Sequence, residues 1–350
     1  MTRRVLVVRL DSDGDVLLSG PAVRAVAGSG GEVVLWCGPR GRSAAGLLPG
    51  VHRILEWRCP WIDPVPAPVQ APEVLAVVAS LAALRVAEAV VLTSFHQSPL
   101  PTALLLRLAG VGRITGVSVD YPGALLDVRL RPGADPGRDG TGLDEDLPEP
   151  QRALAIAAAA GYRLPPGDEG RLAVRPPPSV THLTGDEPYL VLHPGADAPA
   201  RSWPEQRCAE AVRVLRAAGH RVLVTGSPAE RELTARVAAG HGEDLGGRTD
   251  LGQLAGVLAG ADVLVAGNTG PAHLAAAVGT PVVSLFAPVV PARRWAPYGV
   301  PHVLLGDQGA PCRDSRARHC PVPGHPCLSS VTAGQVLAAV QGLIGAEMAA

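Results

Sequence analysis

Lysine is missing from this sequence and asparagine occurs only once, as Asn268, so the 31 residues counted as Lys or Arg are all arginines. Without lysine there is no G-x-x-x-x-G-K-[ST] loop, which excludes the P-loop class of kinases and ATPases. No G-x-G-x-x-G turn follows the first apolar segment, and the sequence has no G-x-S-x-G elbow. These absences argue against an NAD-dependent dehydrogenase and against an α/β-hydrolase.

Membrane-length apolar runs are missing as well. Arg, Glu, Gly and Pro interrupt the apolar stretches, and the run at residues 5–8 ends at Arg9 and Asp11, too early for a secretory signal. The net charge of -1 gives no overall attraction for nucleic acid or for an anionic membrane surface. We therefore expect a cytoplasmic protein with reduced cysteines and no nucleic-acid partner. Peripheral contact with a membrane and the oligomeric state stay open.

Short apolar segments alternate with helical patterns in both halves of the 350 residues. This length and rhythm predict two α/β domains, each with a parallel sheet covered by helices. The Pro- and Gly-rich stretch at 171–187 is the expected linker. The domains are then 1–170 and 188–330, followed by a final helix at 331–350, for which packing on the N-terminal domain is one option. Ligands of such sheets bind at the carboxyl ends of the strands.

The apolar patterns also give boundaries for the individual elements. Strands are predicted at residues 5–9, 32–36, 52–55, 88–92, 113–116, 189–193, 220–225, 262–266 and 281–286. Helices are predicted at residues 16–27, 72–85, 99–109, 151–161, 204–218, 228–239, 251–259, 271–278 and 331–346.

The most informative segment is a predicted strand, turn and helix that contains G-N-T-G-P-A-H at residues 267–273. Pro271 suits the first turn of a helix because it has no N–H to leave unpaired, and Thr269 can cap that helix. Gly267 and Gly270 allow the backbone to approach a ligand closely. Backbone amides at a helix start bind phosphate, so the turn is a candidate phosphate site, although ordinary α/β turns share the pattern.

Two further polar loops follow predicted strands in the second half. In H-P-G-A…R-S-W-P at 193–204, Arg201 either binds a diphosphate with both arms of its guanidinium or is a solvated loop charge. Trp203 is expected to pack rather than to stack on a base. In T-G-S-P-A-E at 225–230, Glu230 either favours the dipole of the next helix or binds ribose hydroxyls.

Three carboxylates crowd the loop after the first strand, in R-L-D-S-D-G-D-V at residues 9–16. Repulsion among Asp11, Asp13 and Asp15 can raise the pKa of one of them and make it a better base. Asp15 is alternatively the N-cap of the next helix. Alternating aspartates also bind Mg²⁺, whereas the position of Gly14 and the missing Glu exclude an EF-hand calcium loop.

Three of the six cysteines, Cys312, Cys320 and Cys327, share one loop near the C-terminus with the spacing C-x₇-C-x₆-C. Structural zinc sites normally contain a closer C-x₂₋₄-C pair. We therefore expect a packed loop without metal and keep zinc as the alternative.

Four of these motifs together resemble the bacterial heptosyltransferase family, the ADP-heptose:lipopolysaccharide heptosyltransferase type of glycosyltransferase family 9. They are R-L-x-x-x-G-D-V at 9–16, H-P-G-A…R-S-W-P at 193–204, T-G-S-P-A-E at 225–230 and N-T-G-P-A-H-L-A-A-A-V-G-T-P at 268–281. The matches are collinear over nearly the whole chain. The resemblance implies a GT-B fold, in which two Rossmann-like domains face each other across a cleft with their parallel sheets. It also implies an inverting glycosyltransferase that requires neither metal nor cofactor.

The resemblance assigns roles to the matching residues. Asp15 corresponds to the catalytic aspartate that takes the proton of the acceptor hydroxyl, and Arg201 stands where the family has a diphosphate-binding lysine. Glu230 falls at the ribose-binding carboxylate, and Thr269 and Gly270 fall at the phosphate-binding turn. The expected donor-binding set is Gly14, Gly195, Ala196, Arg201, Gly226, Glu230, Asn268, Thr269, Gly270, Pro271 and His273.

One departure from the family pattern leaves the donor sugar open. The family's turn has an aspartate before Thr-Gly that touches this sugar, whereas the amide of Asn268 keeps hydrogen bonding and loses the charge. The expected reaction is transfer of a heptose or related sugar from an ADP-sugar or other nucleoside diphosphate sugar to a glycan or other hydroxyl acceptor. The acceptor is expected on the N-terminal domain, where His96 either contacts it or caps a loop. The alternatives are a nucleotide-sugar epimerase-like enzyme and an inactive nucleotide-sugar-binding protein.

Overall fold

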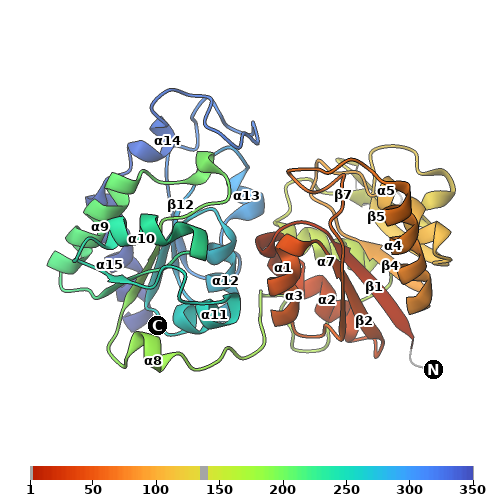
Figure 1. Cartoon of the computed structure of the whole chain (residues 1–350), viewed down its shortest axis with the longest axis horizontal. Coiled ribbons are helices and arrows are strands. Elements are labelled where there is room, and N and C mark those ends of the chain that lie inside the picture. Colours follow the sequence, from red (N-terminus) through yellow and green to blue (C-terminus); the bar gives the residue numbers. More distant parts are fainter. Residues whose placement is uncertain (1–2, 135–140, 350) are drawn as a thin grey trace. The chain divides into compact units, whose positions relative to one another are not determined.

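Two compact units, Met1–Arg175 and Pro176–Ala350, make up the chain in a computed structural model that describes residues 3–134 and 141–349. The boundary falls inside the segment 171–187 that the sequence marks as a linker. Each unit contains a parallel sheet with helices on both faces (Figure 1). The predicted α/β class is therefore confirmed.

The sheet of the first unit is seven-stranded and has the order β3-β2-β1-β4-β5-β6-β7. Its strands are β1 (Arg4–Arg9), β2 (Glu32–Cys37), β3 (Arg53–Glu56), β4 (Glu88–Val91), β5 (Arg113–Val117), β6 (Val128–Pro132) and β7 (Gly142–Leu143). Strand β1 pairs with β2 and β4, so that Val5 lies opposite both Val33 and Glu88. The continuous apolar run of β1 explains its central place, because central parallel strands are buried on both faces.

Helices cover both faces of this sheet. They are α1 (Asp13–Leu18), α2 (Gly20–Ala27), α3 (Arg42–Leu47), α4 (Ala71–Leu84), α5 (Leu100–Leu108) and α7 (Glu149–Ala159), with the 3₁₀ turns η1 (Pro39–Gly41) and η2 (Gly123–Leu125). The prediction of one helix over 16–27 is wrong, because Pro21 supplies no N–H to continue the first helix and Ser19 separates the two. Helix α1 also begins earlier than predicted. Ser12 is at its N-cap position, so Asp15 lies in the first turn and is not the cap.

The sheet of the second unit has six strands in the order β10-β9-β8-β11-β12-β13. They are β8 (Leu190–His193), β9 (Val222–Val224), β10 (Glu243–Asp244), β11 (Val263–Gly267), β12 (Val282–Leu285) and β13 (His302–Leu305). The helices are α8 (Thr181–Thr184), α9 (Glu205–Ala217), α10 (Arg231–Ala238), α11 (Leu251–Ala259), α12 (Gly270–Val278), α13 (Ala292–Trp295), α14 (Pro326–Ser329) and α15 (Ala333–Ala349), with the turns η3 (Pro199–Arg201) and η4 (Pro228–Glu230). Helix α9 contacts α10 and α15, and α11 contacts α12 (Figure 1). Packing of α15 on the N-terminal domain stays a prediction.

Sequence patterns identify the central strands of both sheets and miss the short strands toward the edges, β6, β7, β10 and β13. Edge strands bury fewer side chains, so their apolar pattern is weak. In β6 only Leu130 is buried, and β10 and β13 contain no fully buried residue. These missed strands do not carry the candidate site.

Both sheets have a Rossmann-type strand order, in which the chain starts in the middle, moves to one edge and then returns to the other side. The direction reverses between β1 and β4 in the first unit and between β8 and β11 in the second. Loops at the carboxyl ends of the two diverging strands separate there, and ligands of α/β proteins bind at this point.

Candidate functional site

The motifs found in the sequence lie at these two reversal points. In the first unit, residues 10–15 follow β1 and residues 94–97 follow β4. In the second unit, residues 194–201 follow β8 and residues 268–273 follow β11, while residues 225–230 follow β9 next to β8. Each unit therefore presents its polar motif residues where α/β sheets bind ligands.

Asp15 is held by hydrogen bonds to both of its carboxylate oxygens. The Arg9 guanidinium donates to Oδ1 at 2.8 Å, and the Ser12 hydroxyl donates to Oδ2 at 2.8 Å. The Asp15 side chain is 22% exposed and that of Arg9 only 4%, so a ligand can reach the aspartate and not the arginine. A carboxylate with a fixed orientation and access to solvent suits the predicted role of proton acceptor.

The neighbouring Asp11 is less accessible than Asp15, since 12% of its side chain is exposed. Burial raises the pKa of Asp11 to about 6, an effect that Arg9 opposes and the charge of Asp15 reinforces. Burial also raises the pKa of Asp13, against a hydrogen bond of 2.8 Å that its Oδ1 accepts from the Ala44 amide. Burial is thus the main cause of the raised pKa values. Repulsion among the carboxylates, which the sequence suggests as the cause, contributes less.

The Arg9 guanidinium lies beside the aspartates of this loop, where a bound metal ion would otherwise be expected. The Arg9 guanidinium lies 3.0 Å from Asp11 and 2.8 Å from Asp15. Throughout residues 3–134 and 141–349, no group of three or more His, Cys, Asp or Glu side chains is placed to hold a metal ion. The structure therefore gives no support to the Mg²⁺ alternative for this loop.

The cysteine loop is packed, as predicted. Burial raises the pKa of the Cys312 and Cys327 thiols. Cys312 and Cys327 belong to the apolar core of the second unit, and Cys320 packs against it. All six cysteines are free thiols.

The loops after β8 and β9 are in contact in the second unit. His193 Nδ1 lies 3.0 Å from the Thr225 hydroxyl, and burial lowers the pKa of His193, an effect that Glu230 opposes. Gly195 lies directly against Glu230, since a Cβ at Gly195 would overlap the Glu230 carboxylate. Two of the predicted donor-binding residues are thereby brought together, and their contact requires glycine.

Glu230 also belongs to a helix start. It forms a capping box with Ser227, in which Oε2 accepts a hydrogen bond of 2.7 Å from the Ser227 amide. The helix-terminus interpretation of Glu230 is therefore confirmed. Its contact with ribose stays a prediction, for which Oε1 above Gly195 is the available atom.

The loop after β8 also reaches the turn after β11. A Cβ at Gly267 would lie 2.7 Å from the carbonyl oxygen of Arg201, so the two backbones touch. Trp203, two residues further on, is 3% exposed and donates its indole N–H to Leu328 O at 3.1 Å. The prediction that Trp203 packs is confirmed, and diphosphate binding by Arg201 stays a prediction.

Helix α12 begins immediately after this turn. Thr269 is at the N-cap position with an extended backbone, and Pro271 lies in the first turn as predicted. The predicted side-chain cap is wrong, because the Thr269 hydroxyl instead donates to Gly267 O at 3.4 Å. The dipole of this nine-residue helix still gives the turn a positive potential.

Asn268 has a contact that the sequence does not suggest. Its side chain is buried and pairs with the backbone of Ala287, just beyond β12. Nδ2 donates to Ala287 O at 3.4 Å, and Oδ1 accepts from Ala287 N at 3.3 Å. An amide satisfies both backbone groups, whereas a carboxylate satisfies only the N–H. Asn268 therefore connects the turn after β11 to the loop after β12.

Asn268→Asp is expected to lower the free energy of unfolding by about 1–3 kcal/mol, because the buried Ala287 carbonyl loses its donor and faces a carboxylate. Urea unfolding followed by circular dichroism at pH 7 measures this. The exposed Gln335→Glu change keeps the acceptor that caps Thr332 N and is the matched control, with an effect within about 0.5 kcal/mol. Equal unfolding midpoints for Asn268→Asp and wild type would show that the pairing contributes nothing.

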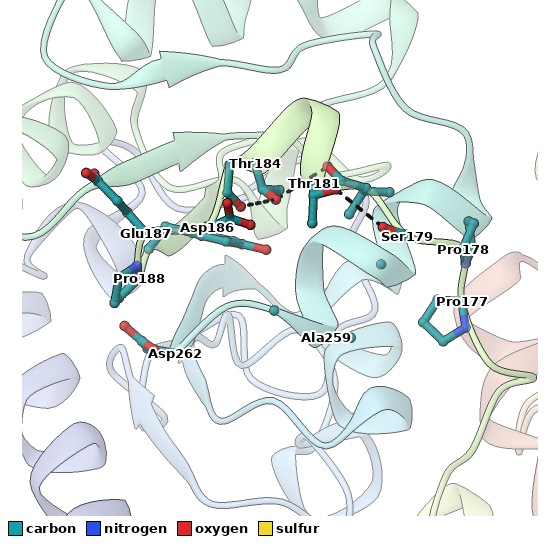
Figure 2. A pocket seen from close by; sticks show the side chains of 15 residues that line it. Pro177, Pro178, Ser179, Thr181, Thr184, Asp186, Glu187, Pro188, Ala259 and Asp262 are labelled. Carbon is teal, nitrogen blue, oxygen red and sulfur yellow. Dashed lines mark hydrogen bonds between the residues drawn. The ribbon is translucent and has the colours of Figure 1, made fainter.

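A pocket of about 520 Å³ lies at the amino ends of the strands β8 and β11 in the second unit. Figure 2 shows Thr181 and Thr184 of α8 on one side of this pocket and Ala259 and Asp262 on the other. The motif residues lie at the carboxyl ends of the same strands. The pocket is therefore separate from the candidate donor site.

The remaining predicted donor residues lie in the same segments. Gly14 is buried within α1 of the first unit, and His273 is buried in the first turn of α12. Gly226 packs on Thr234 and Glu230, since a Cβ at Gly226 would lie 2.6 Å from Thr234 Cγ2 and 3.2 Å from Glu230 Cβ. Ala196 lies in the loop after β8, and Pro271 lies in the first turn of α12. Their contacts with a donor stay predictions.

No sequence pattern points to the charged residues that surround the Asp15 carboxylate. Arg9 is the first residue of the R-L-x-x-x-G-D-V motif, but the motif by itself does not indicate its role. Glu149 and Arg152 carry no local signal, because they lie on α7, which is distant in sequence from Arg9 and from Thr93, the residue that Arg152 contacts at a separation of 59 positions.

Two Rossmann-type units with their motifs at the strand-order reversals define a protein of the GT-B fold. The chain belongs to glycosyltransferase family 9, the heptosyltransferase family, whose sequence profile matches residues 149–324. The predicted fold and family are thereby confirmed.

The chain is also similar to individual heptosyltransferases. Lipopolysaccharide heptosyltransferase 1 of Pseudomonas aeruginosa is 40% identical over 135 residues, which cover 38% of this chain and 38% of that protein. The solved Escherichia coli ADP-heptose lipopolysaccharide heptosyltransferase II has a TM-score of 0.73 at 20% identity and covers 99% of both chains. Escherichia coli heptosyltransferase WaaC, solved with ADP, has a TM-score of 0.67 at 21% identity and covers 97% of this chain and 99% of that one.

Proposed function

We propose that the protein transfers a heptose or related sugar from an ADP-sugar, or another nucleoside diphosphate sugar, to a hydroxyl of a glycan or other acceptor. The observation that carries this proposal is the meeting of three loops in the second unit, where Gly195 touches Glu230 and Arg201 touches Gly267. The family supports a nucleotide-sugar donor, and one structural relative was solved with ADP.

The donor diphosphate is proposed to bind at the turn after β11. Backbone amides of Thr269 and Gly270 and the positive end of α12 suit phosphate oxygens. Arg201, on the adjoining loop, supplies a permanent positive charge with a planar pair of donors. Glu230 Oε1 is proposed to accept hydrogen bonds from the ribose hydroxyls.

Asp15 is proposed to act as the general base. The acceptor O–H bond breaks as its proton passes to the Asp15 carboxylate, and the acceptor oxygen forms a bond to the anomeric carbon. The bond from that carbon to the diphosphate oxygen breaks at the same time, and its electron pair leaves with the nucleoside diphosphate. A single displacement inverts the anomeric configuration. Arg201 and α12 stabilise the charge of the leaving group without a metal ion.

The cellular location belongs to the same proposal. None of the helices within residues 3–134 and 141–349 is long and apolar enough to cross a membrane. We place the reaction in the cytoplasm, with the acceptor on the first unit near residues 94–97. An acceptor carried by a lipid would bring the enzyme to the membrane surface.

ADP is expected to stabilise the protein against heat. At a concentration of 100 times Kd it adds about 2.7 kcal/mol to the stability of the unit that binds it. Thermal-shift curves with ADP, GDP and UDP rank the nucleotides. Arg201→Met is expected to weaken binding by about 10–100-fold, since it removes charged hydrogen bonds.

Arg207→Met is the matched control for this experiment, because Arg207 pairs with the half-exposed Glu210 on α9. It should leave the nucleotide-induced shift unchanged. The absence of a shift with ADP, GDP, UDP and their sugars would refute the proposed donor class.

A further inference from the structure

The charged side chains around Asp15 support a further assignment, which rests on the proposed role of Asp15 as the base. We propose that Arg9 is the positioning residue of this base, and that Asp11 and Glu149 keep the buried arginine paired when Asp15 accepts a proton. The Arg9 cluster consists of two arginines and three carboxylates, Arg9, Arg152, Asp11, Asp15 and Glu149.

Carboxylate or hydroxyl oxygens lie near all three nitrogens of the Arg9 guanidinium. Nη2 donates to Asp15 Oδ1 at 2.8 Å and to Ser94 Oγ at 2.9 Å. Nε lies 3.0 Å from Asp11 Oδ2, and Nη1 lies 3.9 Å from Glu149 Oε2. With 4% of its side chain exposed, Arg9 presents Nη2 to Asp15 in one orientation. The buried Arg9 guanidinium therefore orients the Asp15 carboxylate.

A second layer holds the partners of Arg9 in place. Glu149 Oε2 is also 3.9 Å from Arg152 Nη1, and the same nitrogen donates to Thr93 O at 2.5 Å. Asp11 Oδ1 accepts from Gln97 Nε2 at 2.6 Å. Thr93 and Gln97 follow β4, so the Arg9 cluster joins the two strands at the reversal point of the first unit.

Asp15 is the member of the Arg9 cluster that is proposed to take up a proton. Proton transfer from the acceptor hydroxyl neutralises the Asp15 carboxylate and removes one negative charge beside Arg9. An arginine buried without a partner is strongly unfavourable. Asp11 and Glu149 prevent this, because both remain beside Arg9 after Asp15 is neutralised.

A purely structural role for Arg9 predicts a different result from a positioning role. Structural packing predicts only a loss of stability in variants, whereas positioning predicts a change in the titration of Asp15. Charged and titratable residues on α1 and on the elements packed against it are Asp13, Arg24, Arg40, Arg42, Glu149 and Arg152, in addition to Arg9 and Asp11 of the preceding strand and loop.

The test follows the Asp15 carboxyl carbon by ¹³C NMR across pH in the full chain, with Asp15→Asn to assign the signal. In Arg9→Met the midpoint of the Asp15 titration is expected to rise by about one pH unit or more, because the nearby positive charge is lost. Arg9→Lys should restore part of the shift. Glu149→Gln should lower the midpoint, since it removes a like charge. Unchanged midpoints in Arg9→Met and Glu149→Gln would overturn the proposal.

Arg4→Met is the matched control at the other end of β1, where Arg4 pairs with Glu32 at 2.7 Å. It should leave the Asp15 midpoint unchanged. If Arg9→Met does not fold, Arg9→Lys and Glu149→Gln decide the outcome, with opposite shifts expected.

A kinetic readout separates this proposal from the proposed function. With a donor and acceptor that the wild type turns over, Arg9→Lys should lower kcat by about 10–100-fold and leave ADP affinity unchanged. A wild-type protein that binds no nucleotide would refute the proposed function alone, and the NMR titration would still decide the role of Arg9.

Discussion

Asp15→Asn is expected to lower kcat by about 10²–10⁴-fold, which is the usual contribution of a general base. Asparagine keeps the size of the side chain and an oxygen that accepts from Arg9, but it has no basic site for the acceptor proton. Initial rates of nucleoside diphosphate release, measured with a donor and acceptor pair that the wild type uses, give the effect. ADP affinity should stay at the wild-type value, because the nucleotide is proposed to bind through the second unit.

Asp13→Asn is the control for this prediction. Asp13 lies two residues away on α1 and accepts a hydrogen bond from the Ala44 amide, which an asparagine oxygen can also accept. Its kcat should therefore remain close to that of the wild type. Full turnover by Asp15→Asn would show that another group removes the proton.

Gly195→Ala is expected to weaken ADP binding by about 10–100-fold, as expected for loss of hydrogen bonds to a charged group. The added methyl group would overlap the Glu230 carboxylate and displace it from the position proposed for ribose binding. The loss of stability should be about 1 kcal/mol, because the flexible end of Glu230 can move and only its capping contact with Ser227 is lost. Isothermal titration calorimetry and urea unfolding measure the two quantities.

A double-mutant cycle with Glu230→Ala tests the cause of this effect. If Gly195→Ala acts through Glu230, the double variant should bind ADP about as weakly as Glu230→Ala alone. Additive losses would instead mean that the methyl group blocks the nucleotide itself. Unchanged ADP binding in both single variants would remove Glu230 from the donor site.

Central strands and the loops after them could be predicted because their signals are local. β1, β8 and β11 are short apolar runs followed by Gly, Pro and charged residues, a pattern that places polar groups at the carboxyl end of a parallel strand. The edge strands have few buried residues and gave no such pattern. The break at Ser19 was missed because the apolar periodicity of α1 and α2 continues across it.

Contacts between distant segments could not be predicted in the same way. The pairing of Asn268 with Ala287 and the approach of Glu149 to Arg9 depend on how the strands pair, and the side chains alone do not show it. The expected cap by Thr269 was wrong because its hydroxyl bonds to the preceding Gly267 carbonyl instead. Asp15 was recognised by resemblance, whereas the arginine that orients it became visible only in three dimensions.

The paired amide at position 268 also restricts how this enzyme can evolve. A single codon change from asparagine to aspartate would give the turn the carboxylate that the family usually has. It would also leave the Ala287 carbonyl facing a negative charge in a buried site. A change in donor-sugar preference that needs this carboxylate would therefore depend on a prior rearrangement of the loop after β12. Laboratory evolution of specificity should vary positions 268 and 286–288 together.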